Sequence, residues 1–402
     1  MRRVDLAWLC AVATLAGGCA TASATASATA PAAPPAAPTA GAAHAGHSSW
    51  SAVRSGTRQT LFDVACLTAS RCEAVGAAGT ILGTSNGGRS WRTQRSGTSA
   101  DVYRIACAWP GSCYAIARPA TILVTHNAGW SWQSRTLRIP GVGTATTAPG
   151  CSMPTTAPGP AVPCQVGLLD ISCPSALVCY AVATSPAGYS TLSRPRGSTV
   201  WITRDGGAHW KRQSLPPTVP CAIGDCAGGF AYPLTWVTCL STGLCRMGGE
   251  LFLGCGRCGV LYTVFSTTGP WAPWTLLGCL RRGMCGNGYS PDAAACPTAA
   301  RCYGVTSLMP FDGDNGIFWS DDGGATWPGA VTGVHPLQYD VACASGQVCE
   351  TAGGSGSLFR TTNGGRFAPD RGPSRQDLHG ITCVTSDVCY AVGGNGAILV
   401  RH

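Results

Sequence analysis

The sequence predicts an all-β protein that forms a single seven-bladed β-propeller of four-stranded blades. Three observations predict this fold. A unit of about 40 residues recurs along the chain, each copy contains four strand-length segments, and most copies carry the same two motifs. One motif is a Cys-x5-Cys pair, and the other is Thr/Ser-x-Asp/Asn-x-Gly-x-x-Trp, which we call the Asp box. Because no blade can bury both of its faces alone, such units stack around a ring.

The clearest copy of the repeat shows how one blade is built. Its strands, A to D, are expected at Leu61–Cys66, at Cys72–Gly76, at Thr80–Ser85 and from Trp91 onward. The Cys-x5-Cys pair then spans the A–B turn, and the Asp box forms the C–D turn. The 54 glycines and 28 prolines of the chain suit short strands and many turns. The seven units start near Leu61, Val102, Leu169, Trp236, Ala294, Tyr339 and Leu378.

The two ends of the chain are expected to complete one blade together. The seventh unit stops at His402, after its strand C, and lacks an Asp box and a strand D. Near the N-terminus, Ser49–Thr57 matches Ser90–Thr98 almost residue for residue. The N-terminal segment therefore supplies strand D of the last blade, and this closure leaves no gap between the first and last blades.

The Asp box is predicted to stabilise its own turn. Its Asp or Asn side chain can accept hydrogen bonds from backbone N–H groups of the turn, and its glycine permits a positive φ. Its Trp can pack between adjacent blades. We therefore expect a role in folding, rather than in catalysis, for the boxes that end at Trp91, Trp132, Trp210 and Trp327.

The cysteine spacing indicates disulfides in an exported protein. The chain has 24 cysteines, of which Cys10 and Cys19 lie in the N-terminal leader. Metal binding is the alternative, but isolated pairs without a second pair or nearby histidines cannot complete a tetrahedral site. We predict the disulfides Cys66–Cys72, Cys107–Cys113, Cys173–Cys179, Cys239–Cys245, Cys296–Cys302, Cys343–Cys349 and Cys383–Cys389. No pairing is predicted for Cys151, Cys164, Cys221, Cys226, Cys255, Cys258, Cys279 and Cys285, although the last two share the regular spacing.

The N-terminus is typical of a surface lipoprotein. Two arginines, an apolar run from Leu6 to Ala16 and then Cys19 indicate a signal peptide at residues 1–19 with a lipobox-like end. Residues 20–48 form an Ala/Thr/Pro-rich tether, and the propeller occupies residues 49–402. We expect lipidation of Cys19 and a membrane-anchored location at the cell surface. Cleavage just beyond Cys19, which would give a secreted protein, is the alternative.

The charge pattern argues against a nucleic-acid partner. The net charge is +9, but neither the single Lys211 nor the arginines form a basic run that could follow a phosphate backbone. No cofactor and no metal are expected. We predict a monomer whose partner is a protein or a glycan of the cell envelope, and which meets the membrane only through its lipid anchor.

The repeat itself resembles those of known propellers. The Cys66–Trp91 unit and the Asp boxes at Thr203–Trp210 and Ser320–Trp327 are similar to the Asp-box propellers, also called bacterial neuraminidase repeats. The TxDGGxxW form resembles the photosystem II assembly-factor branch. This resemblance covers residues 49–402 and implies the fold. The superfamily includes assembly factors, sialidases and xyloglucanases, so the resemblance does not identify an activity.

The long departures from the repeat are expected on one face of the ring. In a four-stranded meander the A–B and C–D turns share one face, and the B–C turns and D–A links share the other. Variable loops on a rigid scaffold are where binding usually occurs, although tolerated surface variation is the alternative. These insertions belong to blades two to five and lie at 139–168, 186–198, 216–235, 249–259, 275–293 and 309–316.

Several side chains of these insertions are candidates for ligand binding. The arginines could pair bidentately with a carboxylate or phosphate, and the tyrosines could contact a protein or a sugar; solvated loop side chains are the alternative. Asp312 and Asp314 resemble part of a calcium loop, but the later acidic ligands are missing and a tight B–C hairpin is favoured. Cys255-Gly-Arg-Cys258 could be a redox or zinc motif, but structural disulfides are favoured. The candidates are Arg138, Tyr189, Arg194, Arg196, Arg257, Arg281, Arg282, Tyr289, Asp312 and Asp314.

The resulting hypothesis is a non-catalytic binding or assembly module. The alternative is a sialidase-like or other glycoside hydrolase, which would need an arginine set or paired carboxylates. Arg138 stands in an Arg-Ile-Pro sequence similar to the sialidase motif, but it follows the second Asp box instead of preceding the first. Glu250 is the only glutamate within the insertions. No catalytic set can be assembled from these residues, and nothing in the chain indicates a photosynthetic partner.

Overall fold

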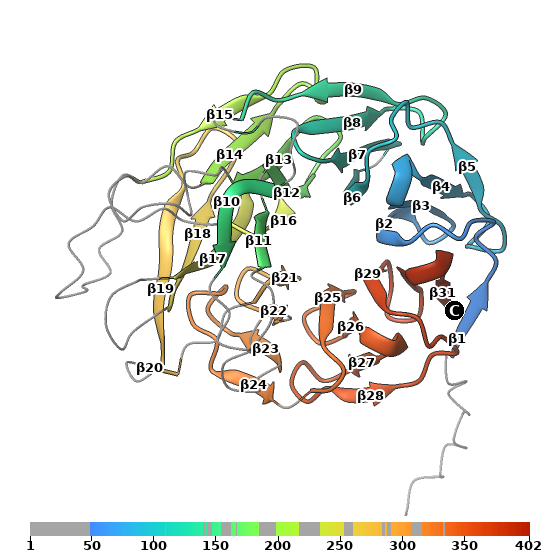
Figure 1. Cartoon of the computed structure of the whole chain (residues 1–402). Helices are drawn as coiled ribbons and strands as arrows, with labels where there is room; N and C mark the ends of the chain where they lie inside the picture. The colour runs from blue at the N-terminus through green and yellow to red at the C-terminus, as the bar shows by residue number, and fades with distance from the viewer. Residues whose placement is uncertain are drawn as a thin grey trace, which may run out of the picture. The chain divides into compact units, whose positions relative to one another are not determined.

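A computed structural model gives the fold of the propeller. It describes residues 49–108, 110–139, 142, 147–153, 162–165, 167–184, 198–216, 234–252, 260–283, 286–287, 291–306, 316–332 and 334–402. Seven antiparallel sheets follow one another around a ring, each with its strand A toward the centre (Figure 1). The predicted all-β, seven-bladed fold is therefore confirmed.

The first three blades follow the predicted units closely. Blade one contains β2 (Leu61–Thr68), β3 (Arg71–Gly76), β4 (Ile81–Thr84) and β5 (Arg92–Gln94). Blade two contains β6 (Val102–Ala108), β7 (Ser112–Ala117), β8 (Thr121–Thr125) and β9 (Gln133–Thr136). Blade three contains β12 (Gly167–Ser172), β13 (Cys179–Thr184), β14 (Ser198–Thr203) and β15 (Lys211–Gln213).

The remaining blades complete the ring. Blade four contains β16 (Trp236–Ser241), β17 (Leu244–Phe252), β18 (Val260–Thr267) and β19 (Thr275–Gly283), with the short β20 (Gly286–Asn287) at its edge. Blade five contains β21 (Ala293–Ala295), β22 (Cys302–Val305), β23 (Gly316–Ser320) and β24 (Gly329–Thr332). Blade six contains β25 (Gln338–Cys343), β26 (Cys349–Gly353), β27 (Leu358–Thr361) and β28 (Ala368–Asp370). Blade seven contains β29 (Leu378–Cys383), β30 (Cys389–Gly393), β31 (Ile398–Arg401) and β1 (Trp50–Val53).

The ends of the propeller close the ring as predicted. Strand β1 pairs antiparallel with β31, and Trp50 lies opposite Arg401. The outermost strand of blade seven therefore comes from the start of the propeller, while the other three come from its end (Figure 1).

Helical structure is minor in the described residues. It consists of the 3₁₀ turns η1 (Ala77–Gly79), η3 (Gly354–Gly356) and η4 (Gly394–Gly396), which join strands B and C of blades one, six and seven. None of the described helices has the length and apolar character needed to cross a membrane.

Three predicted insertions are partly strand. The structure extends β17 to Phe252, which pairs with Val260 of β18, so the predicted loop at 249–259 begins as a hairpin. Strand β19 likewise occupies Thr275–Gly283 of the predicted loop at 275–293. The insertion at 139–168 contains a two-stranded sheet of β10 (Thr147–Met153) and β11 (Val162–Gln165). Blade four consequently has longer strands than its neighbours.

The core consists of the seams between blades. Every seam contains one aromatic side chain from the start of a strand D region, packed against the neighbouring blade. The predicted packing of the Asp-box Trp between blades is thereby confirmed. In ring order from the seam between blades seven and one, these residues are Trp91, Trp132, Trp210, Trp274, Trp327, Phe367 and Trp50.

A bulge recurs in the innermost strands. Pairing between strands A and B skips one residue in blades one, two, three, six and seven. The skipped residue stands four places before the first cysteine of the unit. A β-bulge changes the direction of its side chain, which matters for the site below. The skipped residues are Phe62, Tyr103, Leu169, Tyr339 and His379.

Candidate binding face around the central channel

The two faces of the ring are built differently. We call the face with the A–B and C–D turns the Cys-loop face, and the face with the B–C turns and D–A links the insertion face. The seven predicted disulfides are all formed, and each closes an A–B turn on the Cys-loop face. The remaining propeller cysteines lack described side chains, and Cys19 also lies outside the described residues.

The Asp boxes also fasten the Cys-loop face. In blade three, Gly207 donates its backbone N–H to Thr203 Oγ1 at 2.8 Å, and His209 donates its own to Asp205 Oδ1 at 2.9 Å. The hydrogen bond from the backbone of His209 is the main reason why the pKa of Asp205 falls to about 2. Blades one, two and five contain equivalent pairs of bonds. The predicted folding role of the box is confirmed by these contacts.

In four blades, the residue after the second cysteine is hydrogen-bonded to the Cys loop of the next blade. In three blades it is a Tyr whose hydroxyl donates to a backbone carbonyl in the following Cys loop. These bonds run from Tyr114 to Ala176 at 2.6 Å, from Tyr303 to Gly346 at 2.7 Å and from Tyr390 to Ala69 at 2.6 Å. In blade four, Arg246 donates to the carbonyl of Ala299 at 2.7 Å.

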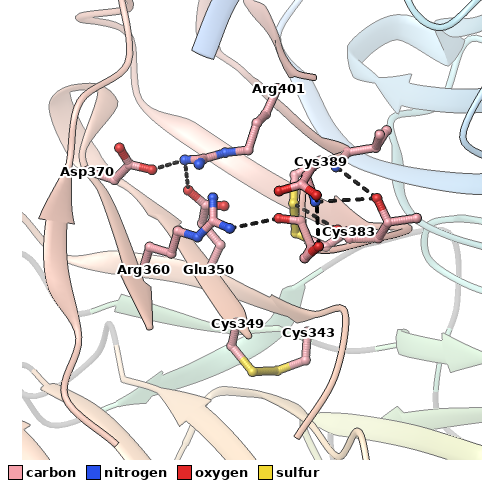
Figure 2. Close-up of a disulfide and its surroundings, with 12 residues drawn as sticks. Cys343, Cys349, Glu350, Arg360, Asp370, Cys383, Cys389 and Arg401 are labelled. Carbon is pink, nitrogen blue, oxygen red and sulfur yellow. Dashed lines mark hydrogen bonds and ion pairs between the residues drawn. A yellow bond between two sulfur atoms is a disulfide. The ribbon is translucent and has the colours of Figure 1, made fainter. Parts of the chain in front are cut away.

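Glutamates replace this Tyr in blades one and six. Figure 2 shows Glu350 with Arg401 and Asp370 at the seam between blades six and seven. Arg401 Nη2 lies 2.8 Å from Glu350 Oε1, and Trp50 Nε1 donates to the same oxygen at 3.0 Å. Burial raises the pKa of Glu350, while Arg401 and Trp50 oppose that rise. The chain's last strand and its first are thus joined by one buried carboxylate.

This glutamate does not form a metal site. Its carboxylate lies close to the sulfur atoms of Cys383 and Cys389. Those two sulfurs are bonded to each other (Figure 2) and have no thiolate to offer.

The insertion face contains a row of aromatic side chains beside the central channel. We call Tyr339, His379, Phe62 and Tyr103 the aromatic crescent. The rings of Phe62 and Tyr103 stack with their centroids 4.7 Å apart, and His379 lies 6.1 Å from Phe62 and 5.6 Å from Tyr339. The guanidinium of Arg118 covers the ring of Tyr103 at 4.1 Å. All four rings are partly exposed, and burial lowers the pKa of His379, so its ring is neutral at pH 7.

The crescent is held in position by the D–A links. Asp101 accepts a backbone N–H of the η1 turn from Ala78 at 2.8 Å and the hydroxyl of Tyr103 at 3.2 Å. Asp377 accepts the backbone N–H of Ser355 in η3 at 2.7 Å. The crescent is therefore a fixed surface in which each ring supports the next.

The channel beside the crescent is acidic. Asp63, Asp170, Asp340 and Arg104 occupy equivalent positions on four innermost strands, and all line a cavity of about 120 Å³. Arg104 Nε lies 3.8 Å from Asp170 Oδ1. Burial raises the pKa of all three carboxyl groups more strongly than the positive charge of Arg104 lowers it.

These carboxylates also connect adjacent blades. Each accepts a backbone N–H from strand A of the next blade. Asp63 accepts that of Ile105 at 2.8 Å and Asp170 accepts that of Val237 at 2.7 Å. Asp340 accepts that of Ile381 at 3.0 Å. Burial raises the pKa of Asp63 to about 7 and that of Asp170 to about 6, and it also raises the pKa of Asp340. The three side chains act as braces around the channel and give its mouth an acidic character.

The predicted ligand-binding residues stay a prediction. Arg138 is exposed just after β9. Arg281 and Arg282 lie in β19, where they pair with Leu261 and Val260. Tyr189, Arg194, Arg196, Arg257, Tyr289, Asp312 and Asp314 lie outside the described residues.

Sequence reasoning missed the aromatic crescent. A signal was present, because the position four residues before the first cysteine is Phe, Tyr, Tyr or His in four of the units. The length of the repeat alone does not show that a bulge brings these four rings together at the channel mouth.

Comparisons with known proteins agree with the fold. Residues 42–156 match the family model described as photosynthesis system II assembly factor YCF48. No curated protein matches the chain. Among solved structures, YCF48 bound to a D1 peptide is 15% identical with a TM-score of 0.56, covering 88% of this chain and 96% of that one. YCF48 from Cyanidioschyzon merolae is 16% identical with a TM-score of 0.56, covering 88% and 98%.

Propellers outside that group are similar in shape as well. The WD40 repeats of RRP9 are 11% identical with a TM-score of 0.57, covering 88% of this chain and 97% of that one. Identities this low show the fold alone. In its repeats and its seven-bladed ring, the chain resembles the Asp-box propellers and YCF48 among them.

Proposed function

We propose that this protein is an exported, lipid-anchored and non-catalytic module that binds a protein partner on its insertion face. One observation carries the proposal: the aromatic crescent lies on that face, beside the acidic channel. Its side chains are held in place and are partly exposed. The predicted insertions belong to the same face. Rigid aromatic side chains supply contact area at little entropic cost, as in many protein interfaces.

The similarity to YCF48 supports a polypeptide partner. A YCF48 structure contains a bound D1 peptide, so a propeller with this arrangement of blades can hold a polypeptide. An envelope glycan is the second class of partner, since partly exposed aromatic rings also stack on sugars.

A glycoside hydrolase is disfavoured by the carboxylates that the structure describes. Glu73 and Glu350 are buried in seams and accept hydrogen bonds there. Asp63, Asp170 and Asp340 each accept a backbone N–H. A fluorogenic panel of sialosides and β-glycosides tests this alternative: we expect no hydrolysis. Turnover that is lost in Glu250→Ala or Asp312→Ala would contradict the proposal.

Export and anchoring are tested on the intact precursor. We expect incorporation of labelled fatty acid in cells that make the protein, and none in Cys19→Ser. Label retained in Cys19→Ser, or absent from both chains, would contradict the anchor while leaving partner binding open.

Site-specific photo-crosslinking tests partner binding. A photoreactive residue is placed at Gln59 or Gln376, both exposed in D–A links, and in a matched chain at Gln347, exposed in a Cys loop. We expect a discrete protein adduct from Gln59 and Gln376 in native cells and none from Gln347. A glycan adduct would shift the partner class, and protein adducts from Gln347 alone would overturn the choice of face.

A further inference from the structure

Exposed apolar side chains gather on the Cys-loop face. Four large apolar residues of the described chain are exposed, and all four stand in or beside turns of that face: Trp130 at 87%, Trp271 at 80%, Leu177 at 58% and Leu240 at 45%. They belong to blades two, three and four. Trp130 and Trp271 are in C–D turns, and Leu177 and Leu240 are in or beside A–B turns. We call this set the apolar tips.

The tether enters the propeller on the same face. Strand β1 is the strand D of blade seven, so Trp50, its first residue, lies at the C–D side of the ring. Pairing of Trp50 with Arg401, the last residue of β31, agrees with that position. The chain that precedes residue 49, which carries Cys19, therefore joins the propeller on the Cys-loop face.

We infer that the Cys-loop face docks on a lipid bilayer and inserts the apolar tips into its interfacial layer. The tips are spread along an arc of three neighbouring blades, whereas a protein partner would favour one contiguous patch. Trp is the side chain that prefers the membrane–water interface, because its ring is apolar and its N–H is polar.

A positively charged side chain beside the apolar tips suits contact with lipid headgroups. Arg204 stacks over the ring of Trp271 at 4.0 Å and donates to the carbonyl of Pro270. A guanidinium beside an exposed Trp can approach phosphate while the ring enters the apolar region. Exposed apolar tips would also give a lipid anchor the second signal that stable membrane binding usually requires.

This inference departs from the sequence-based expectation that only the lipid anchor meets the membrane. It also orients the proposed function, because a docked Cys-loop face leaves the insertion face turned away from the bilayer. The two proposals stand on different residues, so either can fail alone.

Vesicle co-sedimentation tests the docking. The probe is a suspension of vesicles made of phosphatidylcholine and phosphatidylglycerol in equal parts, mixed with the oxidised chain from residue 20, which lacks the leader and lipid but keeps the compact unit His47–His402. We expect this chain to sediment with the vesicles. The variant Trp130→Ser/Trp271→Ser should bind at least tenfold more weakly, and Leu177→Ser/Leu240→Ser should be weakened in the same direction.

Matched controls make the result decisive. Phe62→Ala/Tyr103→Ala removes two partly exposed rings from the opposite face and should sediment like the parent chain. A parent chain that stays in the supernatant would overturn the inference. So would equal sedimentation of the parent and both tip variants, each shown folded by circular dichroism. Loss of protein adducts at Gln59 with normal vesicle binding would contradict only the proposed function.

Discussion

The two faces of this ring use aromatic residues in opposite ways. On the insertion face, Phe62 and Tyr103 stack ring on ring, are partly buried, and border an acidic channel. On the Cys-loop face, Trp130 and Trp271 project from turn tips and leave more than three quarters of their surface exposed. The stacked rings of the aromatic crescent form a fixed surface that suits a partner of defined shape, such as a folded protein. The separate, exposed Trp rings of the apolar tips suit the fluid apolar layer of a bilayer. The difference indicates that a propeller can divide two kinds of recognition between its faces.

Reduction of the disulfides should weaken the Cys-loop face most. Each closes a loop with a sequence separation of 6, and a loop of this size contributes about 2 kcal/mol on the chain-entropy model. Seven such losses would approach the whole unfolding free energy of an ordinary domain, roughly 5–15 kcal/mol. We expect the reduced, thiol-blocked chain to be unfolded in urea concentrations that leave the oxidised chain folded. Coincident urea transitions would show that the bonds do not fasten the ring.

Arg401→Ala should be the most costly single substitution at the ring closure. It removes the ion-pair partner of Glu350, which is 2% exposed, from the seam of Figure 2. Removing one partner of a buried ion pair costs about 3–5 kcal/mol. Urea unfolding measures the loss, and Arg366→Ala, an exposed arginine on the same face, is the control. Equal urea midpoints for Arg401→Ala and Arg366→Ala would contradict a stabilising role for the ion pair of Arg401 with Glu350.

Glu73→Gln should change the pH dependence of stability. Burial raises the pKa of Glu73 to about 8, although a hydrogen bond from Gln94 acts the other way. The unfolded chain loses this proton near its ordinary pKa, and the folded chain keeps it until about pH 8, so the unfolding free energy falls as pH rises through that window. Gln removes the ionisation and keeps an acceptor for Gln94.

The test of this glutamate compares two pH values. We expect Glu73→Gln to exceed the parent chain in unfolding free energy by about 5 kcal/mol at pH 9 and to match it more closely near pH 5. Glu350→Gln is the matched control, because its carboxylate faces Arg401 and its loss should destabilise at both pH values. A parent-like pH profile for Glu73→Gln would contradict the buried, protonated state.

Phe62→Ala should have the smallest effect on folding and the largest on partner binding. The ring stacks on Tyr103 and is partly exposed, so its loss should cost about 1 kcal/mol of stability. We expect the protein adducts from Gln59 and Gln376 to fall at least tenfold. Trp271→Ser serves as the control and should leave those adducts unchanged; the reverse pattern would exchange the roles of the two faces.

The repetitive parts of the fold could be predicted from the sequence. Ser49–Thr57 matched Ser90–Thr98 and so predicted the pairing of Trp50 with Arg401. Regular spacing likewise predicted the seven disulfides and the turn contacts of Thr203 and Asp205. Each of these depends on local geometry that every copy repeats.

The candidate sites could not be predicted, because they depend on departures from the repeat. Trp130 and Trp132 stand two places apart, and only the folded turn shows that one is exposed while the other packs in a seam. Tyr339, His379, Phe62 and Tyr103 come from four units and meet only through their bulges and the closure of the ring. The contact of Glu350 with Arg401 crosses between two blades. The spacing of residues along the chain does not predict contacts between side chains of different blades.

Depth-dependent quenching on membrane-bound protein tests the central claim most directly. A fluorescent non-canonical residue is placed at Thr242, exposed in the A–B turn of blade four, or at Ser99, exposed in the D–A link before blade two. The lipidated protein is then bound to vesicles that contain brominated lipid. If the Cys-loop face docks on the bilayer, the fluorophore at Thr242 is quenched and the one at Ser99 is not. Equal quenching at both positions, or quenching at Ser99 alone, would contradict the assignment of the two faces.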